Sequence, residues 1–180
     1  MKKLNRKGFT LIELLAIIVV LAIIMVVTIP TILSSVNSAT AKTFKNSADA
    51  IEKWVGDEYV LAVTGQMTND SDNKFVKICT PTNSYCVTSQ TITGNADTGV
   101  ASNTDGEAFL KAAGQVASNY SEVKITVDAN TNRVCIKLKA SSKGDFAGIP
   151  YDKDNAYMEG IGTPDANGSY TSYYMKSNGC

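Results

Sequence analysis

The sequence predicts an α+β fold in which a long N-terminal α-helix, apolar in its first half and amphipathic in its second, packs against a small antiparallel β-sheet. Three observations predict it. Residues 9–29 are almost wholly apolar, residues 34–62 repeat their apolar side chains at the helical period, and residues 122–139 hold two alternating segments around a polar turn. The 180 residues suffice for one domain with a core of its own, but not for two large ones.

The apolar segment is long enough to cross a membrane. From Phe9 to Ile29 its only charged residue is Glu13, and as a helix it reaches about 30 Å, the thickness of a bilayer's hydrocarbon core. A buried core helix is the alternative, but cores rarely supply so long an apolar run. A secretory signal would be followed by a small-x-small cleavage site, which is missing here. Four basic residues precede the segment, so the positive-inside rule keeps them cytoplasmic and exports the rest: Lys2, Lys3, Arg6 and Lys7.

Two residues of this helix are unusual for a membrane segment. Glu13 costs about 2.5–3.5 kcal/mol in lipid, and such carboxylates are usually functional and partnered. It lies in the first helical turn, where a negative charge suits the helix dipole. The alternative is that its side chain snorkels to the membrane edge. Pro30 lacks an N–H and crowds the carbonyl of Val26, which predicts a kink or local melting. The alternative, that Pro30 ends the helix, is disfavoured because residues 34–62 are still helical in pattern.

The second half of the helix carries one apolar stripe. Its residues follow at steps of three and four: Thr40, Phe44, Ala48, Ile51, Val55, Tyr59 and Ala62. The stripe is most simply a core face against which the sheet packs. A coiled-coil seam is the weaker alternative, because Ala and Thr dominate its early half. Asp49 and Lys53, four residues apart, are expected to form an ion pair.

The rest of the chain predicts a head of one helix and a few strands. A loop-rich region runs over 64–103, with a strand candidate at 74–80. A helix is expected over 105–118, capped by Thr104 or Asp105. Residues 122–128 and 133–139 are expected to form a β-hairpin, and 170–175 are a candidate for the last strand.

Composition argues against catalysis and against general nucleic-acid binding. The chain contains no His, so it lacks the usual general base, the Ser-His and Cys-His pairs and the commonest metal ligand. Lys and Arg number 17 and Asp and Glu number 17. The zero net charge offers no general surplus for phosphate. We expect neither an enzyme nor a cofactor.

The residues Lys7-Gly8-Phe9-Thr10-Leu11-Ile12-Glu13-Leu14 resemble the leader and cleavage motif of type IV pilins and the related pseudopilins. The resemblance covers residues 1–30. It implies that a prepilin peptidase removes the leader, residues 1–8, between Gly8 and Phe9 and methylates the amine of Phe9. Gly8, which has no Cβ, suits an extended chain in a tight protease cleft; a simple loop glycine is the alternative for this residue alone.

The resemblance also implies how the mature subunit assembles. Residues 9–33 would serve as the membrane and filament-core half of the helix, 34–62 as its amphipathic half and 63–180 as the globular head. Glu13 would pair with the free amine of Phe9 on a neighbouring subunit, and Pro30 lies at the family's usual distance from the cleavage point. The implied partners are other copies in a helical filament and the inner-membrane assembly machinery. The implied location is the cytoplasmic membrane, then an extracellular pilus.

Three roles within this class stay open. The chain is expected to be a structural pilin. A minor subunit that binds a surface or DNA at the tip, and a pseudopilin of a secretion or competence system, are the alternatives.

Four cysteines, Cys79, Cys86, Cys135 and Cys180, lie on the exported side, where disulfides are favoured and three pairings are open. Cys79 and Cys86 bracket a short turn and can pair locally. Cys135 with Cys180 would then resemble the C-terminal disulfide loop of many pilins; free thiols are the alternative. With no CxxC and no His, a zinc site is not expected.

Two acidic segments, Asp70–Asn73 and Asp152–Asn155, resemble fragments of calcium loops, and some pseudopilins hold calcium in a C-terminal loop. Neither continues with the Gly and distant Glu of an EF-hand. We therefore expect solvated loop carboxylates at both, with calcium at Asp152 and Asp154 as the alternative.

Overall fold

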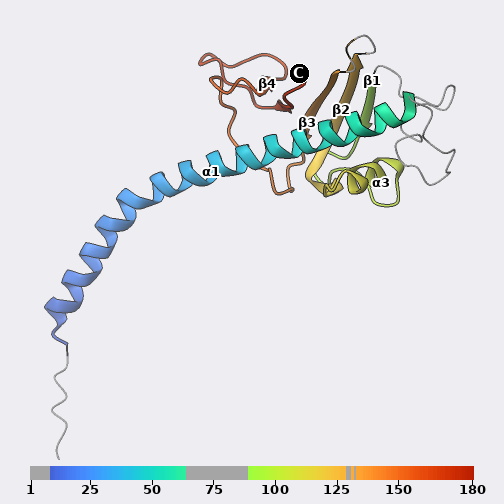
Figure 1. Ribbon diagram of the computed structural model, residues 1–180. Coiled ribbons are helices and arrows are strands. Elements are labelled where there is room, and N and C mark those ends of the chain that lie inside the picture. Colours follow the sequence, from blue (N-terminus) through green and yellow to red (C-terminus); the bar gives the residue numbers. More distant parts are fainter. Residues whose placement is uncertain (1–8, 64–88, 129–130, 132) are drawn as a thin grey trace, which may run out of the picture. The chain divides into compact units, whose positions relative to one another are not determined.

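The computed structural model describes residues 9–63, 89–128, 131 and 133–180. The chain divides into two compact units, Met1–Ala39 and Thr40–Cys180. Helix α1, Leu11–Val63, runs through both. The second unit contains the predicted globular part and the α1 residues from Thr40 onward, and we call this whole unit the head from here on. It holds the five-stranded antiparallel sheet (Figure 1). The predicted α+β class is confirmed.

The sheet has the strand order β1-β2-β3-β5-β4. Its strands are β1 (Ser89–Thr93), β2 (Tyr120–Asp128), β3 (Arg133–Ala140), β4 (Met158–Gly160) and β5 (Tyr173–Lys176). The predicted hairpin is confirmed as β2 and β3, with Val123 opposite Leu138 and Ile125 opposite Ile136. These apolar residues are buried and alternate with half-buried or exposed ones, as a strand with one covered face requires.

The apolar stripe of α1 covers that sheet. Phe44, Ala48, Ile51, Val55 and Tyr59 are buried in one core cluster with the inward residues of β2 and β3. The prediction of a core face is therefore confirmed, and the coiled-coil alternative is not needed. The predicted Asp49–Lys53 pair is wrong: among the described residues Asp49 pairs with Lys45, on the preceding turn.

The second helix is shorter than predicted. Helix α3 spans Asp105–Ala112, capped by Thr104, whose Oγ1 accepts from the Glu107 N–H at 3.1 Å. Gly114 ends it in the left-handed region (φ 73°), where its own N–H reaches the Lys111 carbonyl and the next N–H reaches that of Leu110. This is a Schellman cap, which needs a residue that tolerates positive φ. A 3-10 turn, Ala117–Asn119, follows and leads into β2.

Two strands lie where the sequence did not predict them. Strand β1 falls inside the predicted loop 64–103 and pairs with β2 along five residues. Strand β4 is a three-residue edge strand on β5. The predicted last strand is confirmed as β5, at 173–176 instead of 170–175. The strand candidate at 74–80 lies outside the described residues.

Candidate assembly segment

The N-terminus of α1 is closed by a reciprocal pair of Thr10 and Glu13. Glu13 Oε2 accepts hydrogen bonds from the Thr10 N–H (2.8 Å) and the Thr10 hydroxyl (2.7 Å), and the Glu13 N–H points to Thr10 Oγ1 at 3.4 Å. Because α1 begins at Leu11, Thr10 is the N-cap residue and Glu13 the third helical residue. This is a capping box, which satisfies backbone donors that the first turn leaves unpaired.

The capping box leaves Glu13 able to bind a further partner. Its side chain is exposed, and both hydrogen bonds from Thr10 converge on one oxygen, Oε2. An ionised carboxylate has about four acceptor positions on its two oxygens. Both Thr10 donors survive a cut after Gly8, since the Phe9–Thr10 peptide bond is kept. A cation could therefore join Glu13 without breaking the cap.

The surface around Glu13 is apolar and uncovered. Every large apolar side chain of α1 from Leu11 to Val36 is about half exposed or more, up to 85% at Leu11. Within the described residues, α1 is the one helix long and apolar enough to cross a membrane, judged by length and composition. Exposing so much apolar surface to water is costly, so this segment requires lipid or other helices around it.

Helix α1 continues through Pro30. The backbone is helical on both sides of Pro30, so the alternative that Pro30 ends the helix is wrong. No melted turn interrupts the helix at Pro30. Hydroxyls nearby bond to carbonyls of the same helix: Thr28 to Ile24 (2.9 Å), Thr31 to Thr28 (2.8 Å) and Ser35 to Thr31 (3.0 Å). Side chains that back-bond in this way are tolerated in helices surrounded by lipid or other helices.

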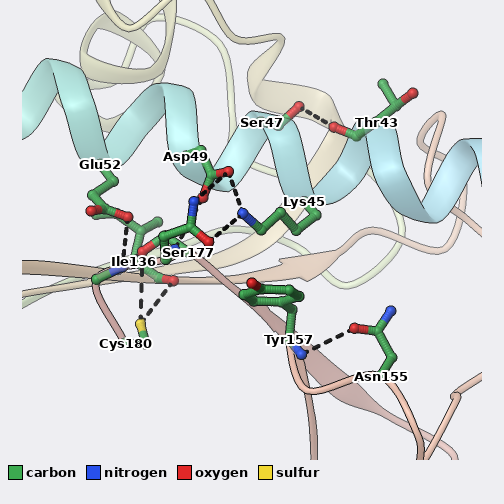
Figure 2. A network of polar contacts seen from close by, with 12 residues as sticks. Thr43, Lys45, Ser47, Asp49, Glu52, Ile136, Asn155, Tyr157, Ser177 and Cys180 are labelled. Atoms are coloured by element: carbon green, nitrogen blue, oxygen red, sulfur yellow. Dashed lines mark hydrogen bonds and ion pairs between the residues drawn. The ribbon is translucent and has the colours of Figure 1, made fainter.

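The C-terminal residues are tied to both layers of the head. A disulfide joins Cys135 of β3 to Cys180. The Ser177 N–H donates to the Ile136 carbonyl (2.9 Å), and the Gly179 N–H donates to Glu52 on α1 (2.8 Å). Figure 2 shows the polar contacts of this region, with Lys45, Asp49 and Glu52 of α1 on the side of the helix that faces Ser177 and Cys180. Cys79 and Cys86 lie outside the described residues, so their pairing stays a prediction.

The acidic segment at 152–155 forms local turns. Asp152 Oδ1 accepts from the Asp154 N–H (3.0 Å), and Asn155 Oδ1 accepts from the Tyr157 N–H (3.0 Å). Across the part of the chain that the structure describes, no three Cys, Asp or Glu side chains gather as metal ligands would. The segment 70–73 and the predicted cleavage residue Gly8 lie outside the described residues.

Comparison with known proteins supports the assignment of the N-terminal segment. Residues 3–29 match the family model described as the prokaryotic N-terminal methylation motif. The chain therefore carries a class III prepilin leader, the kind found on type IV pilins. No curated protein and no solved structure matches the chain.

The match ends within the apolar half of α1 and does not extend to the head. The leader implies processing by a prepilin peptidase and assembly into a pilus-type complex, and together with the apolar helix it fits insertion into a membrane before assembly.

Thr10 is the functional residue of this segment that the sequence analysis did not name. Its signal, Thr at the N-cap followed three residues later by Glu, is present in the sequence.

Proposed function

We propose that this chain is a structural subunit of a type IV pilus-like filament, and that it polymerises through α1 once residues 1–8 have been removed. The observation that carries the proposal is the exposed apolar surface of residues 11–36, which overlaps the methylation motif of residues 3–29 and bears one carboxylate, Glu13. Such a surface can be stored in a membrane and then transferred to a bundle of like helices.

In this proposal, Glu13 sets the axial position of each subunit relative to its neighbour. Between Phe9 and Lys42 the mature chain has no Lys or Arg, so the α-amine of Phe9 is the cation available at that depth. A carboxylate desolvated among helices needs an opposite charge. An amine from the neighbouring subunit satisfies this need only at one axial offset, which would fix how far successive subunits rise.

The remaining site residues have defined parts in the proposal. The peptidase would cut between Gly8 and Phe9 and methylate Phe9, and Pro30 would weaken the helix where one backbone hydrogen bond is lost. Cys135 and Cys180 would brace the exported head. The head would face solvent along the filament, since its own apolar stripe is already buried against the sheet.

The proposal is tested by co-expressing the full chain with a prepilin peptidase and a pilus assembly system, then shearing and imaging the cell surface. Filaments composed of this chain support it. Cleaved subunits that stay in the membrane, although the same system assembles its own pilin, would contradict it.

A further inference from the structure

A lysine, an asparagine and an aspartate meet where the C-terminus crosses α1. Lys45 Nζ donates to Asn178 Oδ1 at 2.7 Å. Asp49 Oδ2 contacts Lys45 Nζ and also accepts from Asn178 Nδ2 at 3.2 Å. One carboxylate oxygen thus touches both the amine and the amide nitrogen. Asn178 is 133 residues from Lys45 in the sequence, so the fold alone brings them together.

The surroundings hold these three groups in place. The Lys45 side chain is only 16% exposed, and its Nζ lies 4.4 Å from the centre of the Tyr157 ring. The Asn178 backbone N–H donates to Asp49 Oδ1 at 3.0 Å, and the Gly179 N–H donates to Glu52, which Figure 2 labels on α1. The disulfide to Cys135 fixes Cys180. Groups held this close react as if at very high concentration.

We propose that Lys45 and Asn178 form an intramolecular amide bond, an isopeptide cross-link, with Asp49 as the catalytic residue. Asp49 takes a proton from the Lys45 ammonium. The neutral amine moves from its place beside Oδ1 to the face of the carboxamide and attacks Cγ. The protonated Asp49 then gives its proton to Nδ2, the Cγ–Nδ2 bond breaks and ammonia leaves. The ammonia takes the second proton of Nζ and departs as ammonium, so that Asp49 ends as the carboxylate it began as.

The reaction is balanced without any co-reactant. One C–N bond forms and one breaks, nothing is oxidised or reduced, and the positive charge of Lys45 departs as ammonium. Ammonia can leave through the open groove of about 670 Å³ that Asp49 and Asn178 line. The product would tie α1 covalently to the C-terminal residues, next to the disulfide that ties those residues to β3. This inference concerns the head and does not depend on the proposed polymerisation.

The test is the intact mass of the purified, reduced full chain. We expect it to be one molecule of ammonia lighter than the processed sequence. Trypsin should then fail to cut after Lys45 and release one branched peptide made of residues 43–53 and 177–180. Lys45→Arg and Asp49→Asn should restore the full mass, whereas Lys42→Arg, a matched change on the same helix, should keep the loss.

Two results would overturn the proposal. One is a wild-type chain of full mass. The other is an ammonia loss that persists in Lys45→Arg, which would assign it to ring closure at an Asn-Gly pair such as Asn167-Gly168. A wild-type chain of full mass overturns the proposal without any variant having to fold. If the wild-type chain is lighter, the branched tryptic peptide distinguishes the cross-link from ring closure.

Discussion

At the scale of residues, Glu13 has two separable roles. In the single subunit it closes the helix N-terminus with Thr10, and in the proposed filament it receives the amine of a neighbour. The first role explains how a carboxylate can remain in an apolar segment before assembly: its charge lies in the first turn and accepts two hydrogen bonds. Substitutions that affect one role and spare the other can therefore distinguish capping from assembly.

We expect Glu13→Ala to leave leader cleavage and membrane insertion intact while abolishing most filaments, because the neighbour's amine loses its counter-charge. Glu13→Gln keeps a side chain that can accept from Thr10 but carries no charge, so it should fail in assembly as well. The measurement is the amount of subunit in sheared filaments relative to the membrane fraction. Filaments of normal number and length from Glu13→Ala would contradict the charge-pair account.

Thr10→Val is the matched test of the cap. It removes the hydroxyl of Thr10 but leaves the charge of Glu13, and loss of an N-cap costs about 1 kcal/mol of helix stability. We expect fraying of the first turn, seen as faster exchange in detergent of the amides of Glu13 and Leu14, which bond to Thr10, with filaments still formed. Thr10→Ser should behave as wild type. An assembly defect as severe as that of Glu13→Ala would instead assign the main role to the cap.

The ion pair of Asp49 shows why some residue-scale features could not be predicted. From the sequence, Lys45 and Lys53 each lie four residues from Asp49, and orientation favours Lys53, because an acidic residue placed N-terminal to the basic one is the better arrangement on a helix. The choice of Lys45 follows from partners far along the chain, Tyr157 and Asn178, which lie on the same side of α1. Local spacing carries no information about such partners. The Thr10–Glu13 cap, in contrast, depends only on residues three positions apart, so the sequence alone is enough to predict it.

At the scale of elements, the clearest predictions came from periodicity. The stripe of α1 and the β2–β3 hairpin each have a regular apolar pattern and a defined solvent face. Strand β1 has one buried apolar residue, Ile92, in a run of Ser, Gln and Thr, so its pairing with β2 decides its structure. Helix α3 ended early because Gly114 offers a left-handed cap that outweighs the apolar pattern beyond it.

Cys180→Ser tests the brace between the C-terminus and the sheet. The Cys135–Cys180 bond closes a separation of 45 residues, which the chain-entropy model values at about 4 kcal/mol. We expect the free energy of unfolding of the oxidised protein to fall by several kcal/mol, measured by urea titration in detergent. Under reducing conditions wild type and variant should coincide. Non-reducing peptide maps that join Cys180 to Cys79 or Cys86 would contradict the pairing.

At the scale of the whole molecule, the two units differ in how their apolar side chains are covered. The first exposes apolar side chains that only lipid or other helices can cover. The second buries its own core, including the Tyr120 ring beside Phe44 and Phe146. The methylation motif covers residues 3–29. Its short local pattern was therefore enough to predict the class of the N-terminal segment, whereas no such motif in the head predicted a specific function.

Alkaline pH should weaken the head through Tyr120. Burial raises the pKa of Tyr120 to about 12, above its ordinary value of about 10. The unfolded chain therefore loses this proton first, and stability that is complete below pH 10 is lost as pH rises toward 12. We expect the urea midpoint to fall across that window and to fall less steeply in Tyr120→Phe. Equal slopes in both proteins would show that Tyr120 is not responsible.

The proposed function requires that a subunit cut after Gly8 polymerises through α1. The most direct test is the intact mass and N-terminal sequence of this chain in filaments sheared from cells that express it. We predict a subunit that lacks residues 1–8 and begins with an N-methylated Phe9. Filaments whose subunits begin at any other residue, or retain the leader, would contradict the account.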